Sequence, residues 1–413
     1  MNPARISVPE LLDAFRPGAT IYLQGATGEV RALQQALAAE PDRLSGVTLV
    51  SCLVPGMNAF DYGALHPNVR VRVFMMSPAM RGSFDQGRTE IVPLPYSGVA
   101  EHLAALDADL AILNLAPPVD GRCSFGACAD FGPIVGARRK VGALNPGLPR
   151  TLQAPGVIAA DLDAVIEIDE TPSAGAPTKV NRELATIAKR VADLIPDKAA
   201  IQSGIGGAPE AAWSALAGKR GLRLRSGMVT DGFLAALDAG AMTPDGHVAG
   251  VAYGSEALYA RLHGSDLVRF ADVRETHGAR ALMGVERLHA INSALEVDLF
   301  GQANLEWREG RLISGVGGSP DFARAARLSP GGRFILALPA TAANGAVSRI
   351  VPQLRAPSVS LSRDLADVVV TEHGVACLRE LTLDARAEAL IAIAAPDHRD
   401  ALANAWAELR RAL

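Results

Sequence analysis

An internal sequence repeat constrains the fold of this chain more than any other feature. The segment PGATIYLQGATGEVRALQQAL begins at Pro17 and PDKAAIQSGIGGAPEAAWSAL begins at Pro196, an offset of 179 residues in a chain of 413. A glycine lies eight positions after each proline, at Gly25 and Gly204. Two further pairs, GVTLVS with GLRLRS and LAILN with HAIN, repeat in the same order. One structural unit used twice explains all three pairs, so we predict two similar domains of roughly equal size.

Each predicted domain shows the alternation of an α/β fold. Short β-branched runs such as VTLVSCLV, VRVRVFMM and GRFILALP are separated by helical patterns such as EVRALQQALAAE and NRELATIAKRVADLI. This alternation predicts βαβ units on open parallel sheets that are buried on both faces. Ligands of such proteins bind at the carboxyl ends of the strands, so we expect the active-site cleft between the two domains.

The boundary between the domains is expected in a segment without periodicity. DETPSAGAPTKVN, residues 169–181, combines two prolines with small residues, as is typical of a linker. We therefore predict an N-terminal α/β domain over residues 1–180 and a C-terminal α/β domain over residues 181–413.

Composition and charge exclude several classes of function. The formal net charge is −4 and no basic run alternates with aromatic residues, so no nucleic-acid partner is expected. The chain shows neither the apolar core of a secretion signal nor an apolar stretch of about 18 residues, so no membrane association is expected. Neither the histidines nor the cysteines (Cys52, Cys123, Cys128 and Cys377) have metal-binding spacing. We expect Cys123 and Cys128 to be small buried thiols, and we expect no metal and a cytoplasmic location.

A glycine turn between a strand and a helix is the first candidate for binding chemistry. In QSGIGGAPEAAWSAL, Gly204, Gly206 and Gly207 precede a helix whose first turn holds Pro209. Bare backbone N–H groups at such a helix start suit a phosphate, a carboxylate or a developing oxyanion. The alternative is a plain strand-to-helix turn, since the segment is neither a P-loop nor a full GxGxxG motif.

Two later segments carry further candidates. In INSALEVDLFGQANLEW, Glu296 and Asp298 have the spacing that places both side chains on one face of a strand, as an acid/base pair or as solvated carboxylates. In LISGVGGSPDFARAARLSPGG, Gly315, Gly317 and Gly318 form a flexible loop before a helix. This loop is either a mobile lid over a ligand or a plain connection.

Seven motifs in one order resemble those of the acetyl-CoA hydrolase/transferase family. They are GRCSFGACADF, LNPGLPRT, QSGIGGAPEA, INSALEVDLFGQ, SGVGGSPDFARAA, ALPATAANGAVSRIVP and VVVTEHGVACLR, and they run nearly end to end. The resemblance implies two similar open-sheet domains of the CoA-transferase (NagB/RpiA-like) fold. It also implies coenzyme A as the ligand, a small acyl-CoA and a carboxylate as substrates, and a homodimer.

The chain departs from this family at the residue that carries the chemistry. The resemblance implies a glutamate that attacks an acyl-CoA thioester, giving an acyl-glutamyl anhydride and then a glutamyl-CoA thioester. In the matching segment RLRSGMVTDGF, Gly227 stands at the glutamate position. In TAANG, Ala343 stands where the family has a lysine that contacts CoA. We therefore expect an altered mechanism.

The other site residues also come from the resemblance. The glycine turn would line the thioester and oxyanion region, and later residues would lie along the pantetheine arm. The implied CoA-binding residues are Gly204, Ile205, Gly206, Gly207, Ala208, Leu295, Ser314, Gly317 and Gly318. Glu296 is the nearest remaining carboxylate and a candidate catalytic residue. Three interpretations stay open: an enzyme that transfers CoA or hydrolyses acyl-CoA through Glu296, a bound carboxylate or water; a non-catalytic acyl-CoA-binding or regulatory protein; and a protein for another ligand.

Overall fold

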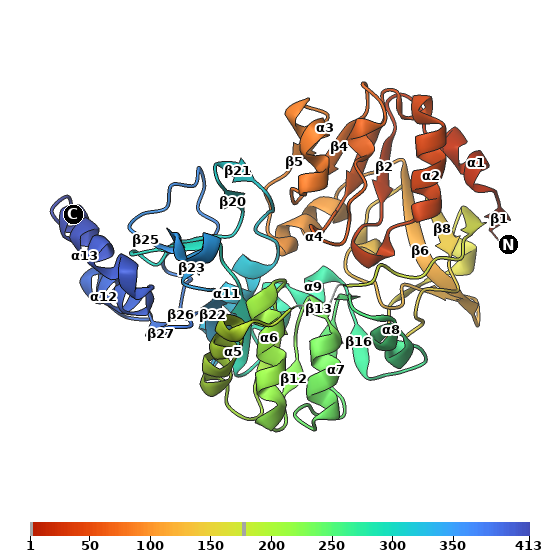
Figure 1. Ribbon diagram of the computed structural model, residues 1–413. Helices are drawn as coiled ribbons and strands as arrows, with labels where there is room; N and C mark the ends of the chain where they lie inside the picture. The colour runs from red at the N-terminus through yellow and green to blue at the C-terminus, as the bar shows by residue number, and fades with distance from the viewer. Residues whose placement is uncertain (1–2, 176–178) are drawn as a thin grey trace.

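The computed structural model describes residues 3–175 and 179–413, and its strands fall into two main sheets (Figure 1). The first half of the chain, red to yellow in Figure 1, surrounds one sheet, and the green-to-blue remainder surrounds the other. The predicted α/β fold class with two open sheets is confirmed. The first sheet ends at Glu167 and the second begins at Ala200, so the boundary predicted at residue 180 lies between them. Of the predicted linker, residues 176–178 lie outside the described residues.

The N-terminal sheet has ten strands and a parallel main path in the order β1-β10-β8-β6-β2-β3-β4-β5. In chain order the path strands are β1 (Ala4–Arg5), β2 (Thr20–Leu23), β3 (Thr48–Ser51), β4 (Arg70–Val73), β5 (Thr89–Ile91), β6 (Leu110–Val119), β8 (Lys140–Leu144) and β10 (Ala164–Glu167). Two antiparallel strands, β7 (Arg122–Ser124) and β9 (Gly156–Ile158), extend from β6. The helices of this half include α1 (Val8–Leu11), α2 (Arg31–Ala39), α3 (Arg81–Asp85) and α4 (Tyr96–Ala104).

The C-terminal sheet has six strands in the order β12-β11-β17-β22-β26-β27, of which only the β26–β27 pair is antiparallel. Its strands are β11 (Ala200–Ser203), β12 (Arg223–Leu224), β17 (Leu288–Asn292), β22 (Arg333–Ala337), β26 (Val368–Thr371) and β27 (Gly374–Cys377). Its helices include α5 (Arg182–Leu194), α6 (Gly207–Ala215), α7 (Asp231–Asp238), α8 (Glu256–Leu262), α9 (Val273–Thr276), α10 (Ala279–Leu282), α11 (Ser319–Leu328), α12 (Leu383–Ile393) and α13 (Pro396–Arg410).

Helix α5 shows how the sequence pattern determines local structure in this half. Asn181 caps it, because the Asn181 side chain accepts a hydrogen bond from the Leu184 N–H at 2.9 Å. Its buried residues are Ile187, Ala188, Val191 and Ala192, which form one apolar stripe at helical spacing. This stripe faces α6 and the sheet, and the charged residues remain on the other side.

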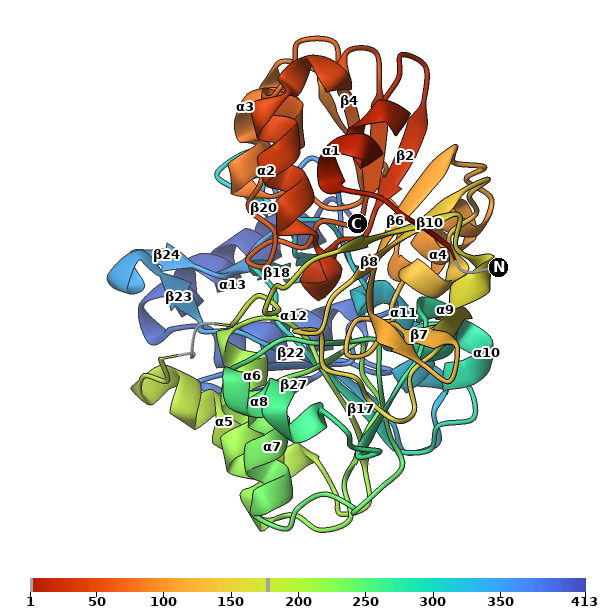
Figure 2. The same cartoon turned by 90° about the vertical axis from the view of Figure 1, so that its right-hand side faces the viewer.

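The two halves are joined by direct hydrogen bonds. Between backbones, the Ala129 N–H donates to the Gly250 carbonyl and the Ala252 N–H donates to the Ala127 carbonyl, both at 2.8 Å. At the start of α4, the Tyr96 N–H donates to the Gly317 carbonyl at 3.1 Å. These contacts bring the carboxyl end of the C-terminal sheet against the N-terminal half (Figure 2).

The expectation that Cys123 and Cys128 are small buried thiols is confirmed. Cys52 is buried as well, and Cys377 is exposed. Cys377 lies on the edge strand β27, where alternate side chains point away from the core. Within the described residues, none of the helices combines the length and the apolar character needed to cross a membrane.

Candidate functional site

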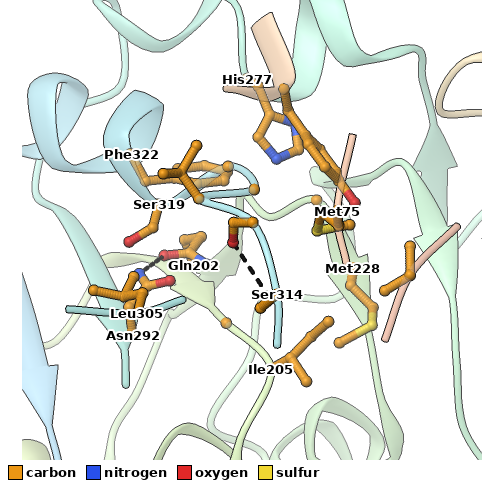
Figure 3. Close-up of a pocket in the computed structure, with 18 of the residues that line it drawn as sticks. Met75, Gln202, Ile205, Met228, His277, Asn292, Leu305, Ser314, Ser319 and Phe322 are labelled. Atoms are coloured by element: carbon orange, nitrogen blue, oxygen red, sulfur yellow. Dashed lines mark hydrogen bonds between the residues drawn. The ribbon is translucent and has the colours of Figure 1, made fainter. Parts of the chain in front are cut away.

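A cavity of about 210 Å³ lies where the two halves meet, and residues from both line it (Figure 3). The N-terminal half contributes Ala26, Val54, Met57, Met75, Tyr96 and Asp130. The C-terminal half contributes Gln202, Ser203, Gly204, Ile205, Gly227, Met228, Val251, His277, Asn292, Ser293, Leu305, Ser314, Gly315, Val316, Gly317, Gly318, Ser319 and Phe322. The location agrees with the general preference of α/β proteins for ligand sites at the carboxyl ends of strands.

The predicted glycine turn forms one wall of this cavity. Strand β11 ends at Ser203, and Gly204 and Ile205 line the cavity before α6 begins at Gly207. A Cβ atom at Gly204 would lie 2.5 Å from the Asn292 Oδ1 atom, so this close approach requires glycine. Gly206 has φ +137°, a conformation that L residues rarely adopt. Gly206, Gly207 and Ala208 belong to the turn and helix start but are not part of the cavity wall.

The predicted glycine loop before α11 also lines the cavity. All five residues from Ser314 to Gly318 belong to the cavity wall. A Cβ atom at Gly315 would lie 2.7 Å from the Phe74 carbonyl oxygen and 2.9 Å from the Met75 Cγ atom. The loop therefore packs closely against the N-terminal half.

Gly227 and Gly318 lie against the same imidazole ring. A Cβ atom at residue 227 would lie 2.6 Å from the Cε1 atom and 2.9 Å from the Nε2 atom of His277. A Cβ atom at residue 318 would lie 2.4 Å from both the Cδ2 and the Nε2 atoms of the same ring. Contacts under 3.0 Å are too close for carbon, so this ring occupies the space that a side chain at residue 227 would enter.

Two aromatic rings contact the His277 imidazole in addition to the two glycines. It follows α9, and its ring centroid lies 5.0 Å from that of Tyr96 and 4.8 Å from that of Phe322. The Nδ1 atom lies 2.9 Å from the Thr276 Oγ1 atom, which itself donates to the Asp272 carbonyl at 3.3 Å. Burial lowers the pKa of His277 to about 3, so the ring is neutral at physiological pH. The sequence gave no signal for this residue, because its partners come from distant segments.

Asp130 is a second ionisable group in the cavity that the sequence pattern did not single out. Its Oδ1 atom accepts a hydrogen bond from the Phe131 N–H at 2.8 Å. Burial raises the pKa of Asp130 to about 7. It lies in the motif GRCSFGACADF, whose local pattern does not mark this carboxylate as a site residue.

Comparison with known proteins identifies the family of the chain. Residues 254–406 match the model of the acetyl-CoA hydrolase/transferase C-terminal domain. The 4-hydroxybutyrate coenzyme A transferase of Clostridium kluyveri is 32% identical over 392 residues, which are 92% of this chain and 91% of that protein. The chain belongs to the acetyl-CoA hydrolase/transferase family.

Other members of the acetyl-CoA hydrolase/transferase family agree with this assignment. The succinyl-CoA:cyclohexane-1-carboxylate CoA transferase of Geobacter metallireducens is 30% identical and covers 94% of this chain and 91% of its own. The crystal structure of RipA from Yersinia pestis matches with a TM-score of 0.91 at 25% identity, over 98% of both chains. The structure of 4-hydroxybutyrate CoA-transferase from Porphyromonas gingivalis matches with a TM-score of 0.82 at 28% identity, over 99% of this chain and 98% of that one.

Besides Gly206, Gly207 and Ala208, three further residues that the resemblance to this family singled out lie outside the cavity wall. Glu296, on β18 (Glu296–Asp298), is half-buried, and its carboxylate accepts a hydrogen bond from the Asn304 Nδ2 atom at 3.1 Å. The neighbouring Leu295 donates its N–H to the Asn304 carbonyl at 2.8 Å. Ala343 is exposed on a turn after β23 (Thr341–Ala342). The cavity-lining residues from the resemblance are therefore Gly204, Ile205, Gly227, Ser314, Gly317 and Gly318.

Proposed function

We propose that this protein acts on the thioester of CoA with a small carboxylic acid, without a covalent intermediate at residue 227. The acceptor is water, which makes the reaction a hydrolysis, or a second carboxylate, which makes it a CoA transfer. Membership of the acetyl-CoA hydrolase/transferase family supports the substrate class. The printed activities of its relatives include both CoA transfer and acetyl-CoA hydrolysis.

One observation carries the change of mechanism. By the family resemblance residue 227 is the nucleophile position, and here it is a glycine whose Cβ direction is filled by His277. Glycine offers no atom that can attack a thioester, and the imidazole leaves no room for one to be added. An acyl-glutamyl anhydride cannot form at this residue.

The cavity supports binding of an acyl-CoA through its two glycine walls. The turn at Gly204 and Ile205 and the loop at Ser314–Gly318 both line the cavity. The apolar side chains of Met75 and Met228 also line it and suit a short acyl chain or the pantetheine arm. Coenzyme A enters this proposal as a substrate, and no metal is needed for the chemistry. A cytoplasmic homodimer remains the prediction for location and assembly.

A panel of acyl-CoA thioesters tests the proposal. Acetyl-, propionyl-, butyryl- and succinyl-CoA are incubated with and without acetate, while free thiol and the acyl-CoA products are both measured. Hydrolysis releases thiol, and transfer conserves the thioester while exchanging its acyl group. We expect consumption of at least one thioester.

A non-catalytic acyl-CoA-binding protein is the second candidate, because the glycine walls are present and the nucleophile is absent. Calorimetric binding of CoA without any turnover would favour it. No binding heat and no thermal shift at millimolar CoA would exclude CoA as the ligand of either candidate.

A further inference from the structure

We propose that His277 takes the place of the missing carboxylate at residue 227, and that its Nε2 atom acts as the general base for hydrolysis of acyl-CoA. This inference rests on the proposed function, because it assigns the group that activates water in the same cavity. It commits to water as the acceptor. His277 is thereby a catalytic residue that contacts the attacking water.

The position of the ring is the first argument. The edge that carries Nε2 lies against both Gly227 and Gly318, and both glycines line the cavity. The rings of Tyr96 and Phe322 both contact the imidazole in tilted arrangements, which restricts its rotation, and Figure 3 shows Phe322 beside His277. The imidazole therefore points a fixed nitrogen atom at the place where a side chain of residue 227 would begin. A catalytic group needs this kind of preorganisation by packed neighbours.

The hydrogen-bond pattern is the second argument. The Thr276 hydroxyl lies 3.3 Å from the Asp272 carbonyl oxygen and 2.9 Å from the Nδ1 atom of His277. The proposed base is the tautomer in which this hydroxyl donates to the carbonyl and accepts from Nδ1–H, which leaves a lone pair on Nε2. No described residue forms a hydrogen bond with this Nε2 atom. An acceptor without a protein partner, on a residue that lines the cavity, has the capacity to bind a water molecule there.

The reaction balances with these groups alone. The Nε2 atom takes a proton from water while the water oxygen bonds to the thioester carbonyl carbon. The carbon–sulfur bond then breaks, and the imidazolium returns the proton to the sulfur. The products are a carboxylic acid and CoA with a free thiol, and nothing is oxidised or reduced. The N–H group of Ile205, a residue that lines the cavity and donates no backbone hydrogen bond within the described residues, is the candidate donor to the tetrahedral oxyanion.

Asp130 is the rival base in the same cavity, and pH separates the two. The described residues that contact the ring include Tyr96 of α4, Gly227, Gly318 and Phe322, and of these Tyr96 carries an ionisable group. Burial raises the pKa of Tyr96 well above 10. With His277 as the base, kcat stays level from pH 8 down to about pH 5, because the imidazole is already unprotonated above its pKa of about 3. With Asp130 as the base, kcat falls as pH drops below about 7.

Variants of His277 test the inference against a matched buried histidine. His289 on β17 is also buried, bonds to the Arg287 carbonyl through Nδ1, and lies outside the cavity wall. We expect His277→Asn and His277→Ala to lower kcat for hydrolysis by about 100- to 10,000-fold with KM changed less than about threefold. His289→Asn leaves kcat unchanged. Thermal unfolding and a binding isotherm for CoA verify that each variant is folded and binds.

The results of these experiments distinguish failure of the His277 assignment from failure of the proposed function. If the wild type hydrolyses acyl-CoA and folded His277→Ala does so at the same rate, the inference is overturned while the proposed function stands. The same holds if Asp130→Asn abolishes turnover and kcat of the wild type falls below pH 7. If the wild type turns over no acyl-CoA, the proposed function fails and the inference fails with it.

Discussion

Asp321 of α11 holds the first turn of α4 in the other half of the molecule through Ser97. The Asp321 carboxylate accepts hydrogen bonds from the Ser97 Oγ atom at 2.6 Å and from the Ser97 N–H at 3.1 Å. A carboxylate at this end of a helix is favoured by the unpaired N–H groups and by the helix dipole. The preceding residue of α4 is Tyr96, which contacts His277. The same interaction therefore joins the two halves and positions one neighbour of the proposed base.

Ser97→Ala is expected to lower the free energy of unfolding by about 1–3 kcal/mol, because it leaves one oxygen of the buried Asp321 carboxylate without its donor. Chemical denaturation measures the change. Ser362→Ala is the matched control, since Ser362 also donates to a carboxylate, that of Asp364, but in an exposed loop. Equal losses in the two variants would contradict a special contribution of the contact between the halves.

Gly227→Glu alone is expected to add no ping-pong CoA transfer and to lower the melting temperature, because its Cβ atom would lie 2.6 Å from the His277 ring. Gly227 is not among the glycines with positive φ, so the backbone itself accepts a side chain there. The paired variant Gly227→Glu with His277→Gly removes the obstacle. We expect it to show acyl-CoA:carboxylate exchange with ping-pong kinetics and an enzyme-CoA thioester that borohydride traps.

Gly227→Gln with His277→Gly is the control for this pair, because an amide is a poor nucleophile. If the glutamate pair folds and binds CoA but exchanges nothing, the transfer chemistry needs more than this position. If Gly227→Glu alone exchanges CoA rapidly, the ring is not the obstacle that its contacts indicate.

Asp130→Asn is expected to stabilise the protein more at pH 8 than at pH 5. The folded pKa of Asp130 is about 7, against 3.8 for an unperturbed aspartate. As pH rises between these values, the unfolded chain loses the proton that the folded protein keeps, so stability falls until about pH 7. The Asp130→Asn variant does not lose stability in this way, because asparagine carries no titrating proton. Thermal unfolding of both proteins from pH 4 to 8 measures it, and a difference in melting temperature that stays constant over this range would contradict the assignment.

Ala343→Lys is expected to tighten CoA binding if the family's lysine contact is what this chain lacks. A cation paired with a phosphate contributes about 1–3 kcal/mol, which is about 5- to 150-fold in Kd. Ala346→Lys adds the same charge at another exposed residue of the turn and is the control. Calorimetry at low and high salt compares the Kd of CoA for the two variants. Identical changes in Kd would mean that the added net charge, and not a specific contact at residue 343, causes the effect.

The sequence predicted the parts of the site that local geometry determines. The glycine turn at Gly204 and the loop at Gly318 were predictable, because glycine before a helix start has a local physical reason. The α/β class followed from alternating strand and helix patterns. Both glycine segments do line the cavity.

The parts that depend on tertiary packing could not be predicted in this way. Glu296 was singled out because it is a carboxylate in a family motif, but its side chain bonds to Asn304 away from the cavity wall. His277 and Asp130 belong to segments far apart in the chain, and their pKa values are set by burial that no local pattern encodes. The exposed Cys377 has the same origin, since a strand's place at a sheet edge depends on the whole topology.

The contact of one ring with two glycines also limits how this cavity can evolve. Any single replacement at Gly227 or Gly318 places a Cβ atom within 2.6 Å of an atom of the His277 ring, whereas loss of the ring alone leaves a hole beside Tyr96 and Phe322. Each first step is therefore harmful, and only the second step repairs it. These three positions are epistatic, and a fitness valley separates this chain from a descendant with a carboxylate at residue 227.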